Sequence, residues 1–202
     1  TVYTPPILKW HPPICAPLRQ RENAQSEKIN PKTNNHHARK ESSTMKITKI
    51  TVGCDHAAYE LKKKVVAHLE ERGIEVIDVG THSADSCDYP NFAHAVCKNV
   101  QDGVTELGIL ICGTGIGMSM CANKHKGIRA GLCGDVFSAE MTRKHNDANV
   151  LCMGARVISF ELACELTDIF LNTPALDEER HRRRVKMIED LEKGGFTPET
   201  AK

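Results

Sequence analysis

Five short apolar segments that alternate with amphipathic stretches constrain the fold of this chain more than any other feature. The apolar segments cover residues 47–52, 74–79, 107–111, 128–132 and 150–153. Between the first two, residues 57–72 carry apolar residues at helical spacing, and Gly73 follows as a stop signal. Strands that alternate with helices in this way indicate βαβ units. We therefore predict an α/β fold with a five-stranded parallel sheet and helices on both of its faces.

Further helices are predicted over residues 88–100, 118–124, 135–145 and 159–171, the last of them with Ser159 as its N-cap. After Pro174, residues 176–191 form a highly charged helix that no further strand follows. A helix left over at the end of a wound sheet often packs on a neighbouring subunit. We therefore expect this C-terminal segment to be a dimerisation helix.

The first 44 residues differ in composition from the rest of the chain. They hold six of the nine prolines, the only tryptophan and a polar run without apolar periodicity. Such a segment does not bury enough apolar surface to offset the entropy of ordering, so we predict a disordered extension at 1–44. An organellar targeting segment and sequence upstream of a natural start at Met45 are both open, and we favour the second. A folded domain at 45–194 and a flexible tail at 195–202 complete the predicted organisation.

The composition also limits the partners of the chain. Its formal net charge is +1, which indicates neither a nucleic-acid partner nor attraction to a membrane surface. No apolar run approaches the roughly 20 residues that span a bilayer. No cysteine or histidine set has zinc-finger spacing, so we expect no metal site. The nine cysteines include no CxxC pair, and the apolar surroundings of several favour reduced, buried thiols in a cytoplasmic protein: Cys97, Cys121, Cys152 and Cys164.

The third apolar segment ends in Cys112 and continues as Gly113, Thr114, Gly115, Ile116 and Gly117. Backbone N–H groups at a helix start bind phosphates and oxyanions, and the same dipole lowers the pKa of a thiol. The segment therefore joins a possible base to an anion-binding loop, although a cysteine alone is more often structural. Its glycine spacing matches neither GxGxxG nor the P-loop. We expect a small phosphate or oxyanion as ligand, and no nucleotide cofactor.

Other polar clusters flank the predicted strands. They contain Asp55 and His56 after the first segment, Tyr89 before the helix at 88–100, His145 and Asn146 before the fifth segment, and Arg156 after it. Because ligands of open parallel sheets bind beyond the carboxyl ends of the strands, we expect all of these clusters to converge on that edge.

Each of these residues also has a structural interpretation. Asp55 is a natural helix N-cap, Tyr89 a candidate for core packing, and His145 a residue that a helix C-terminus favours. Arg180 and Arg184 are four residues apart, so they share a helix face and could clamp a phosphate together. From the residues alone, a solvated basic face balanced by acidic neighbours is the better interpretation of this pair.

Several ordered motifs resemble type B ribose-5-phosphate isomerases, which share a sugar-phosphate isomerase family with the galactose-6-phosphate isomerase subunits. The resemblance covers about residues 45–191 and rests on Gly53-Cys-Asp-His56, Asp88-Tyr-Pro90, Ile111-Cys-Gly-Thr-Gly115, Ala122-Asn-Lys124, Gly127-Ile-Arg-Ala130, His145-Asn-Asp-Ala-Asn149 and Gly154-Ala-Arg156. It implies a Rossmann-like three-layer α/β/α sandwich and a homodimer, with a tetramer as the alternative. It further implies a metal-free enzyme that interconverts ribose 5-phosphate and ribulose 5-phosphate.

The resemblance also implies roles for individual residues. Cys112 looks like the base that moves a proton between C1 and C2, and His145 like the group that opens the furanose ring. Some relatives replace this cysteine by serine and use a later glutamate, but Met118, Ser119 and Met120 occupy that place here. The remaining roles are an enediolate-binding loop at residues 113–117 and substrate contacts from Asp55, His56, Tyr89, Asn146, Arg156, Arg180 and Arg184.

Three other functions are open at this point. A hexose 6-phosphate such as allose or galactose 6-phosphate is the alternative substrate. His145 and the arginine pair favour the pentose, because the galactose-6-phosphate subunits depart from the pattern there. A non-catalytic sugar-phosphate-binding protein is less favoured since Cys112 and His145 are both present. A Rossmann oxidoreductase is disfavoured by the glycine spacing.

Overall fold

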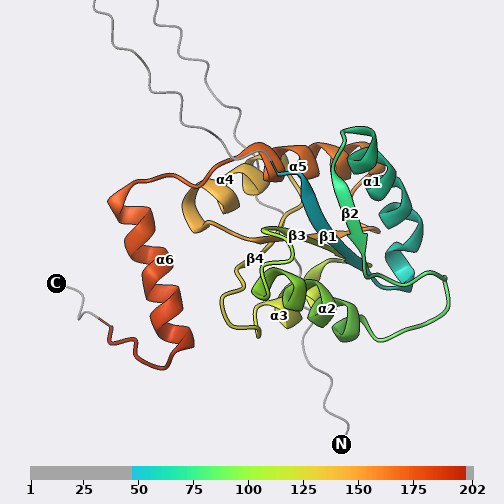
Figure 1. Cartoon of the computed structure of the whole chain (residues 1–202). Helices are drawn as coiled ribbons and strands as arrows, with labels where there is room; N and C mark the ends of the chain where they lie inside the picture. Colours follow the sequence, from blue (N-terminus) through green and yellow to red (C-terminus); the bar gives the residue numbers. More distant parts are fainter. Residues whose placement is uncertain (1–46, 199–202) are drawn as a thin grey trace, which may run out of the picture. The chain divides into compact units, whose positions relative to one another are not determined.

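Five parallel strands form one sheet in the order β2-β1-β3-β5-β4 (Figure 1). The computed structural model describes residues 47–198, so the predicted extension at 1–44 and the end of the predicted tail lie outside the described residues. Each strand is short and lies within a few residues of its predicted position: β1 (Lys49–Cys54), β2 (Glu75–Asp78), β3 (Gly108–Cys112), β4 (Ala130–Leu132) and β5 (Val150–Gly154).

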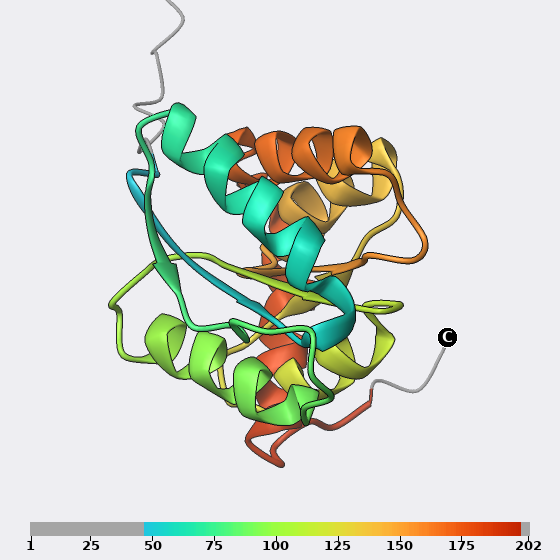
Figure 2. The same cartoon turned by 90° about the vertical axis from the view of Figure 1, so that its right-hand side faces the viewer.

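Helices cover both faces of this sheet (Figures 1 and 2). One face carries α1 (Tyr59–Glu71), α4 (Val136–Asn146) and α5 (Phe160–Asn172). The other carries α2 (Tyr89–Gln101) and α3 (Ile116–Ala122). The predicted three-layer α/β/α fold on a five-stranded parallel sheet is confirmed.

The central strand β3 is buried along its whole length and divides the core in two. Successive side chains of a strand point to opposite faces of the sheet. Ile109 and Ile111 therefore pack under α1, α4 and α5, whereas Leu110 and Cys112 pack under α2 and α3. This alternation places the Cys112 thiol on the face of the sheet that α3 covers, directly before the glycine-rich loop.

Local capping explains where two of the helices begin. The Ser159 side chain accepts a hydrogen bond from the Leu162 N–H at 3.2 Å, which confirms it as the N-cap of α5. The helix predicted from residue 57 begins instead as a 3₁₀ turn, η1 (His56–Ala58), before α1. Of the four cysteines predicted to be buried, Cys121 is only half-buried.

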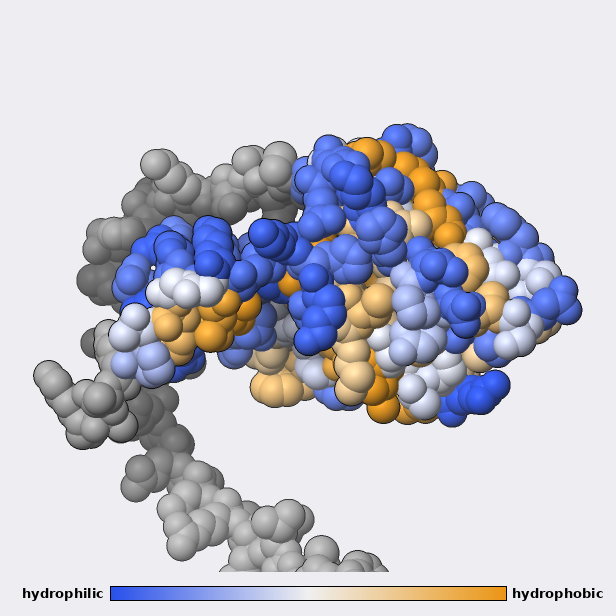
Figure 3. Space-filling model, turned by 90° about the horizontal axis from the view of Figure 1, so that it is seen from below, coloured by the Kyte–Doolittle hydropathy of each residue, from blue (hydrophilic) through white to orange (hydrophobic). Residues whose placement is uncertain are grey.

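The last helix, α6 (Glu179–Glu192), begins three residues later than predicted and lies beside the sheet rather than in either helical layer (Figure 1). The Glu192 carboxylate accepts the Gly127 N–H at 2.9 Å, which ties the end of the helix to the segment before β4. Ile188 and Leu191 remain 43% and 58% exposed. Figure 3 shows apolar side chains gathered on this helix beside charged ones. None of the helices described has the length and apolar character needed to cross a membrane.

Candidate active site

The carboxyl ends of β1, β3 and β5 lie side by side and bring three predicted segments together. Cys112 is in register with Gly154 of β5, and its carbonyl accepts the Ala155 N–H at 2.8 Å. On the other side, the Asp55 N–H donates to the Ile111 carbonyl at 3.2 Å. The segments that carry Asp55 and Ala155 therefore flank the end of β3, as the sequence predicts.

The thiol of Cys112 is directed at the backbone of the loop that follows it. Its Sγ accepts the Gly115 N–H at 3.1 Å, and the residue is 5% exposed. A backbone donor aimed at sulfur stabilises negative charge on that atom. Two other buried thiols, those of Cys54 and Cys97, have a pKa that burial raises to about 12. Those two thiols are therefore structural.

Two of the loop glycines closely approach other parts of the chain. Gly115 has a φ of +77°, and a Cβ there would lie 2.8 Å from the Met153 carbonyl carbon. A Cβ on Gly117 would lie 2.8 Å from Cζ of Tyr89. The Tyr89 ring therefore lies against the loop, which supports the prediction that this residue belongs to the site.

The side chains around the loop are polar and already oriented. The Asp55 carboxylate accepts the Ala57 N–H at 3.0 Å, so this residue caps η1 as expected. His56 Nδ1 accepts the Cys87 N–H at 3.2 Å, which leaves Nε2 of the neutral ring as a donor. The Arg156 side chain lies beside Gly113, with its Cζ 3.8 Å from the position of an added Cβ. This edge offers donors and a cation to an anionic ligand.

His145 and Asn146 do not lie at this edge, so the predicted convergence of all clusters is wrong for a single chain. Both residues end α4, which runs antiparallel to the strands and is followed by β5. The loop that precedes a parallel strand lies at its amino end, whereas Cys112 lies level with Gly154 at the carboxyl end of β5. Four steps of about 3.3 Å place these two edges about 13 Å apart along the strand.

His145 instead stacks on a histidine of the last helix. The rings of His145 and His181 have centroids 4.3 Å apart and planes at 4°. His181 is 4% exposed, and neither of its ring nitrogens has a hydrogen-bond partner within residues 47–198. Burial, with the nearby His145 and Arg180, lowers the pKa of His181. A pocket of about 290 Å³ opens beside both rings, between α4, the segment at 173–178 and α6.

The predicted arginine pair belongs to the same side of the molecule as His145. Arg180 and Arg184 are exposed on α6, one turn apart, and Arg180 Nε donates to a Glu178 carboxylate oxygen at 2.7 Å. One chain therefore presents two separate groups of predicted residues. We call the residues around Cys112 at the carboxyl edge the thiol group: Asp55, His56, Tyr89, Cys112, residues 113–117 and Arg156. We call the residues at the amino edge the histidine group: His145, Asn146, Arg180 and Arg184.

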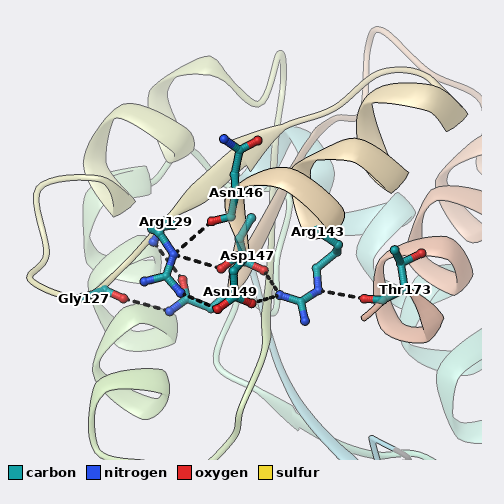
Figure 4. Close-up of polar contacts among 8 residues, drawn as sticks. Gly127, Arg129, Arg143, Asn146, Asp147, Asn149 and Thr173 are labelled. Atoms are coloured by element: carbon teal, nitrogen blue, oxygen red, sulfur yellow. Dashed lines mark hydrogen bonds and ion pairs between the residues drawn. The ribbon is translucent and has the colours of Figure 1, made fainter. Parts of the chain in front are cut away.

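Sequence reasoning missed three residues that support the histidine group. In the sequence, His181 is one member of the basic cluster at residues 180–184, and nothing in that pattern distinguishes it from its neighbours. Arg129 and Arg143 bind both the carboxylate of Asp147 and the backbone around it (Figure 4). The one available signal was the Gly127-Ile-Arg-Ala130 motif, which contains Arg129.

Comparison with known proteins identifies the family. Residues 50–188 match the family model described as Ribose/Galactose Isomerase. The chain belongs to this family. It is 49% identical to ribose-5-phosphate isomerase B of Escherichia coli (strain K12) over 144 residues, which are 71% of this chain and 96% of that protein. Ribose-5-P isomerase B of Listeria innocua is 42% identical over 144 residues, or 71% and 97% of the two chains.

Solved structures of family members have the same fold. Ribose-5-phosphate isomerase B of Clostridium thermocellum gives a TM-score of 0.71 at 45% identity, covering 72% of this chain and 98% of that one. Type B ribose 5-phosphate isomerase of Leishmania infantum gives 0.70 at 41% identity, covering 72% and 97%. The similarity to these family members therefore spans almost their entire length.

Proposed function

We propose that this protein interconverts D-ribose 5-phosphate and D-ribulose 5-phosphate through an enediolate intermediate. The observation that carries the proposal is the Cys112 thiol at the carboxyl end of β3, with the Gly115 N–H donating to its sulfur at 3.1 Å. It provides a buried base beside a loop of backbone donors. The family relatives named as ribose-5-phosphate isomerases support this choice of substrate.

The chemistry proceeds from the open-chain aldose. The Cys112 thiolate removes the proton from C2, and the C2–H electron pair forms the C1–C2 double bond while O1 takes up negative charge. The Cys112 thiol then donates a proton to C1, and the O2 hydroxyl proton passes to O1, which leaves a ketone at C2. Backbone N–H groups of residues 113–117 stabilise the enediolate oxygen, at about 3–4 kcal/mol for one such donor.

Ring opening requires a second group, because ribose 5-phosphate is mainly a furanose in solution. We assign proton donation to the ring oxygen to His145, and phosphate binding to Arg156, Arg180 and Arg184. We assign the binding of sugar hydroxyls or the phosphate to Asp55, His56, Tyr89 and Asn146. No metal or nucleotide takes part in this scheme.

A second copy of the chain completes the site in this scheme. The thiol group and the histidine group lie at opposite edges of one sheet. A two-fold dimer uses the same surfaces on both copies, so the histidine group of each chain can meet the thiol group of the other. Apolar side chains left exposed at the carboxyl ends of β3, β4 and β5 or in the segments that follow them fit such an interface: Ile116 46%, Leu132 44%, Val157 64% and Phe137 70%.

The substrate assignment is tested by incubating the protein with ribose 5-phosphate or allose 6-phosphate and measuring ketose formation. We expect the pentose to give the higher kcat/KM, and Cys112→Ala to abolish turnover while the protein still binds ribose 5-phosphate. A higher kcat/KM with allose 6-phosphate would identify a hexose 6-phosphate as the substrate. Binding without turnover of either sugar would indicate a sugar-phosphate-binding protein.

A further inference from the structure

The turn that joins α4 to β5 contains an unusual backbone conformation. Asp147 has φ 45° and ψ 46°, and it is the one non-glycine residue with a positive φ among residues 47–198. The left-handed region is unfavourable for residues with a Cβ, so surrounding contacts must hold such a residue in place. Asp147 immediately follows His145 and Asn146, the two residues of the turn that the proposed function uses.

Two arginines from different elements supply those contacts (Figure 4). The Asp147 carboxylate accepts from Arg143 Nη1 at 2.8 Å and from Arg129 Nη2 at 3.1 Å. Arg143 belongs to α4, whereas Arg129 directly precedes β4. The two arginine side chains are only 13% and 17% exposed, whereas the Asp147 side chain is 44% exposed. The carboxylate therefore ties the end of α4 to the neighbouring strand.

The same guanidinium groups also bind the main chain of the turn. Arg129 Nε donates to the carbonyls of Asn146 at 3.1 Å and Asp147 at 2.9 Å. Arg143 Nη1 donates to the Ala148 carbonyl at 2.6 Å. The carbonyls of Asn146, the last residue of α4, and of the two residues after it are thus each bonded to an arginine.

Asn149 fixes the far end of the turn. Its Oδ1 accepts the Arg129 N–H at 2.8 Å, and its Nδ2 donates to the Gly127 carbonyl at 2.8 Å. The backbone from Asn146 to Asn149 is therefore held at every residue by contacts with residues 127–129 or with Arg143. These contacts fix the direction in which the end of α4 presents its side chains.

We propose that Asp147, held between Arg129 and Arg143, is a positioning residue that orients His145 and Asn146 for ring opening. The inference rests on the proposed function, because it assigns a purpose to the turn only if His145 acts on the sugar ring. Asp147 itself does not touch the substrate in this proposal.

Two substitutions of Asp147 separate the effect of its carboxylate from the effect of its backbone conformation. Asp147→Gly keeps a residue that adopts a positive φ but removes the carboxylate. Asp147→Asn keeps left-handed tolerance and an acceptor oxygen but removes the charge. We expect kcat on ribose 5-phosphate to fall about 10- to 100-fold in Asp147→Gly, as misplacement of a reacting group does, and less in Asp147→Asn. Full activity in Asp147→Gly overturns the proposal.

Deuterium exchange distinguishes a positioning role in ring opening from general damage. Ribulose 5-phosphate stays acyclic, because the oxygen that would close a five-membered ring on C2 carries the phosphate. Exchange of its C1 hydrogen with D₂O therefore needs Cys112 but no ring opening. Asp147→Gly is expected to retain this exchange while it loses isomerisation of ribose 5-phosphate, and Cys112→Ala to lose both. Equal loss of both reactions in Asp147→Gly overturns the proposal.

Asp168→Asn is the matched control. The Asp168 carboxylate also accepts from two basic side chains, His68 at 2.9 Å and Arg72 at 3.0 Å, but it lies between α1 and α5. Asp168→Asn is expected to keep the kcat of the unaltered protein, and thermal unfolding shows whether each variant is folded. Inactivity of the unaltered protein on ribose 5-phosphate would overturn the proposed function. An active parent with an equally active Asp147→Gly would overturn the positioning role alone.

Discussion

His145 and His181 stack face to face, with ring centroids 4.3 Å apart and planes only 4° from parallel. His181 contributes this contact from the first turn of α6, and its ring is almost fully buried. His145, the residue assigned to ring opening, is therefore held by its own helix α4 and by α6. The sequence alone identifies α6 only as a highly charged helix.

Replacing His181 is expected to change how stability depends on pH. Burial is the largest cause of its lowered pKa, the nearby His145 and Arg180 lower it further, and Glu178 at 3.7 Å opposes them. Below a pH of about 6.5, the unfolded chain takes up a proton that the folded chain does not, so stability falls as pH falls through that value. His181→Phe keeps the stack and removes the titration.

Urea denaturation at several pH values between about 8 and 5 measures this effect. The Phe variant should lose less unfolding free energy than the parent on acidification. Identical pH dependence in the two proteins would show that His181 titrates in the folded state as it does in the unfolded chain.

Gly115→Ala is expected to destabilise the protein and to reduce activity. The positive φ costs about 1–2 kcal/mol, and the collision with the Met153 backbone adds about 1–3 kcal/mol. Gly103→Ala is the matched control, because Gly103 has φ +69° but nothing within 4 Å of an added Cβ. Denaturant titration should show a larger loss of unfolding free energy for Gly115→Ala than for Gly103→Ala. Equal losses would show that the collision with the Met153 backbone does not contribute.

The ion pair of Lys62 and Asp78 is expected to be sensitive to the loss of one partner. Lys62 is 1% exposed and donates to Asp78 at 2.6 Å and to the Thr81 carbonyl at 3.0 Å. Asp78→Ala leaves the buried ammonium without its counter-ion, which costs about 3–5 kcal/mol of unfolding free energy. Glu75→Ala breaks the exposed pair with Lys49 and should cost at most about 1 kcal/mol. Similar losses in both variants would contradict the assignment of Lys62 as a buried charge.

Leu191→Glu is expected to weaken the proposed dimer. Leu191 is 58% exposed on α6, and a carboxylate placed in an apolar interface should raise the dissociation constant at least about tenfold, which is about 1.4 kcal/mol. Val104→Glu is the control, since Val104 is 45% exposed in the loop after α2. Sedimentation measures the dissociation constant, and an unchanged value for Leu191→Glu would exclude this face of α6 from the interface.

The sequence was sufficient to predict the layers of the fold and the thiol group. Apolar segments and capping residues such as Ser159 act locally, so the strand and helix positions follow from the chain alone. Residues that follow a strand, such as Asp55 and Arg156, reach the carboxyl edge whatever the strand order. The edge assigned to His145 was wrong because the loop before a strand was treated like a loop after one.

The support around His145 was beyond sequence reasoning for a different reason. Its contacts join residues distant in the chain, such as Arg129 to Asp147 and His145 to His181, and only the packing of α4 against α6 and β4 brings them together. The predicted roles of the site residues and the dimerisation role of α6 stay predictions.

Mixed dimers test the central claim, which is that Cys112 and His145 act on one substrate from different copies of the chain. Cys112→Ala and His145→Asn chains with different affinity tags are co-expressed, and the dimer that carries both tags is isolated. One of its two sites then has both functional residues, so about half of the parent activity is expected, while each single variant stays inactive as a homodimer. An inactive mixed dimer would contradict the account, because it would place both residues of each site in the same chain.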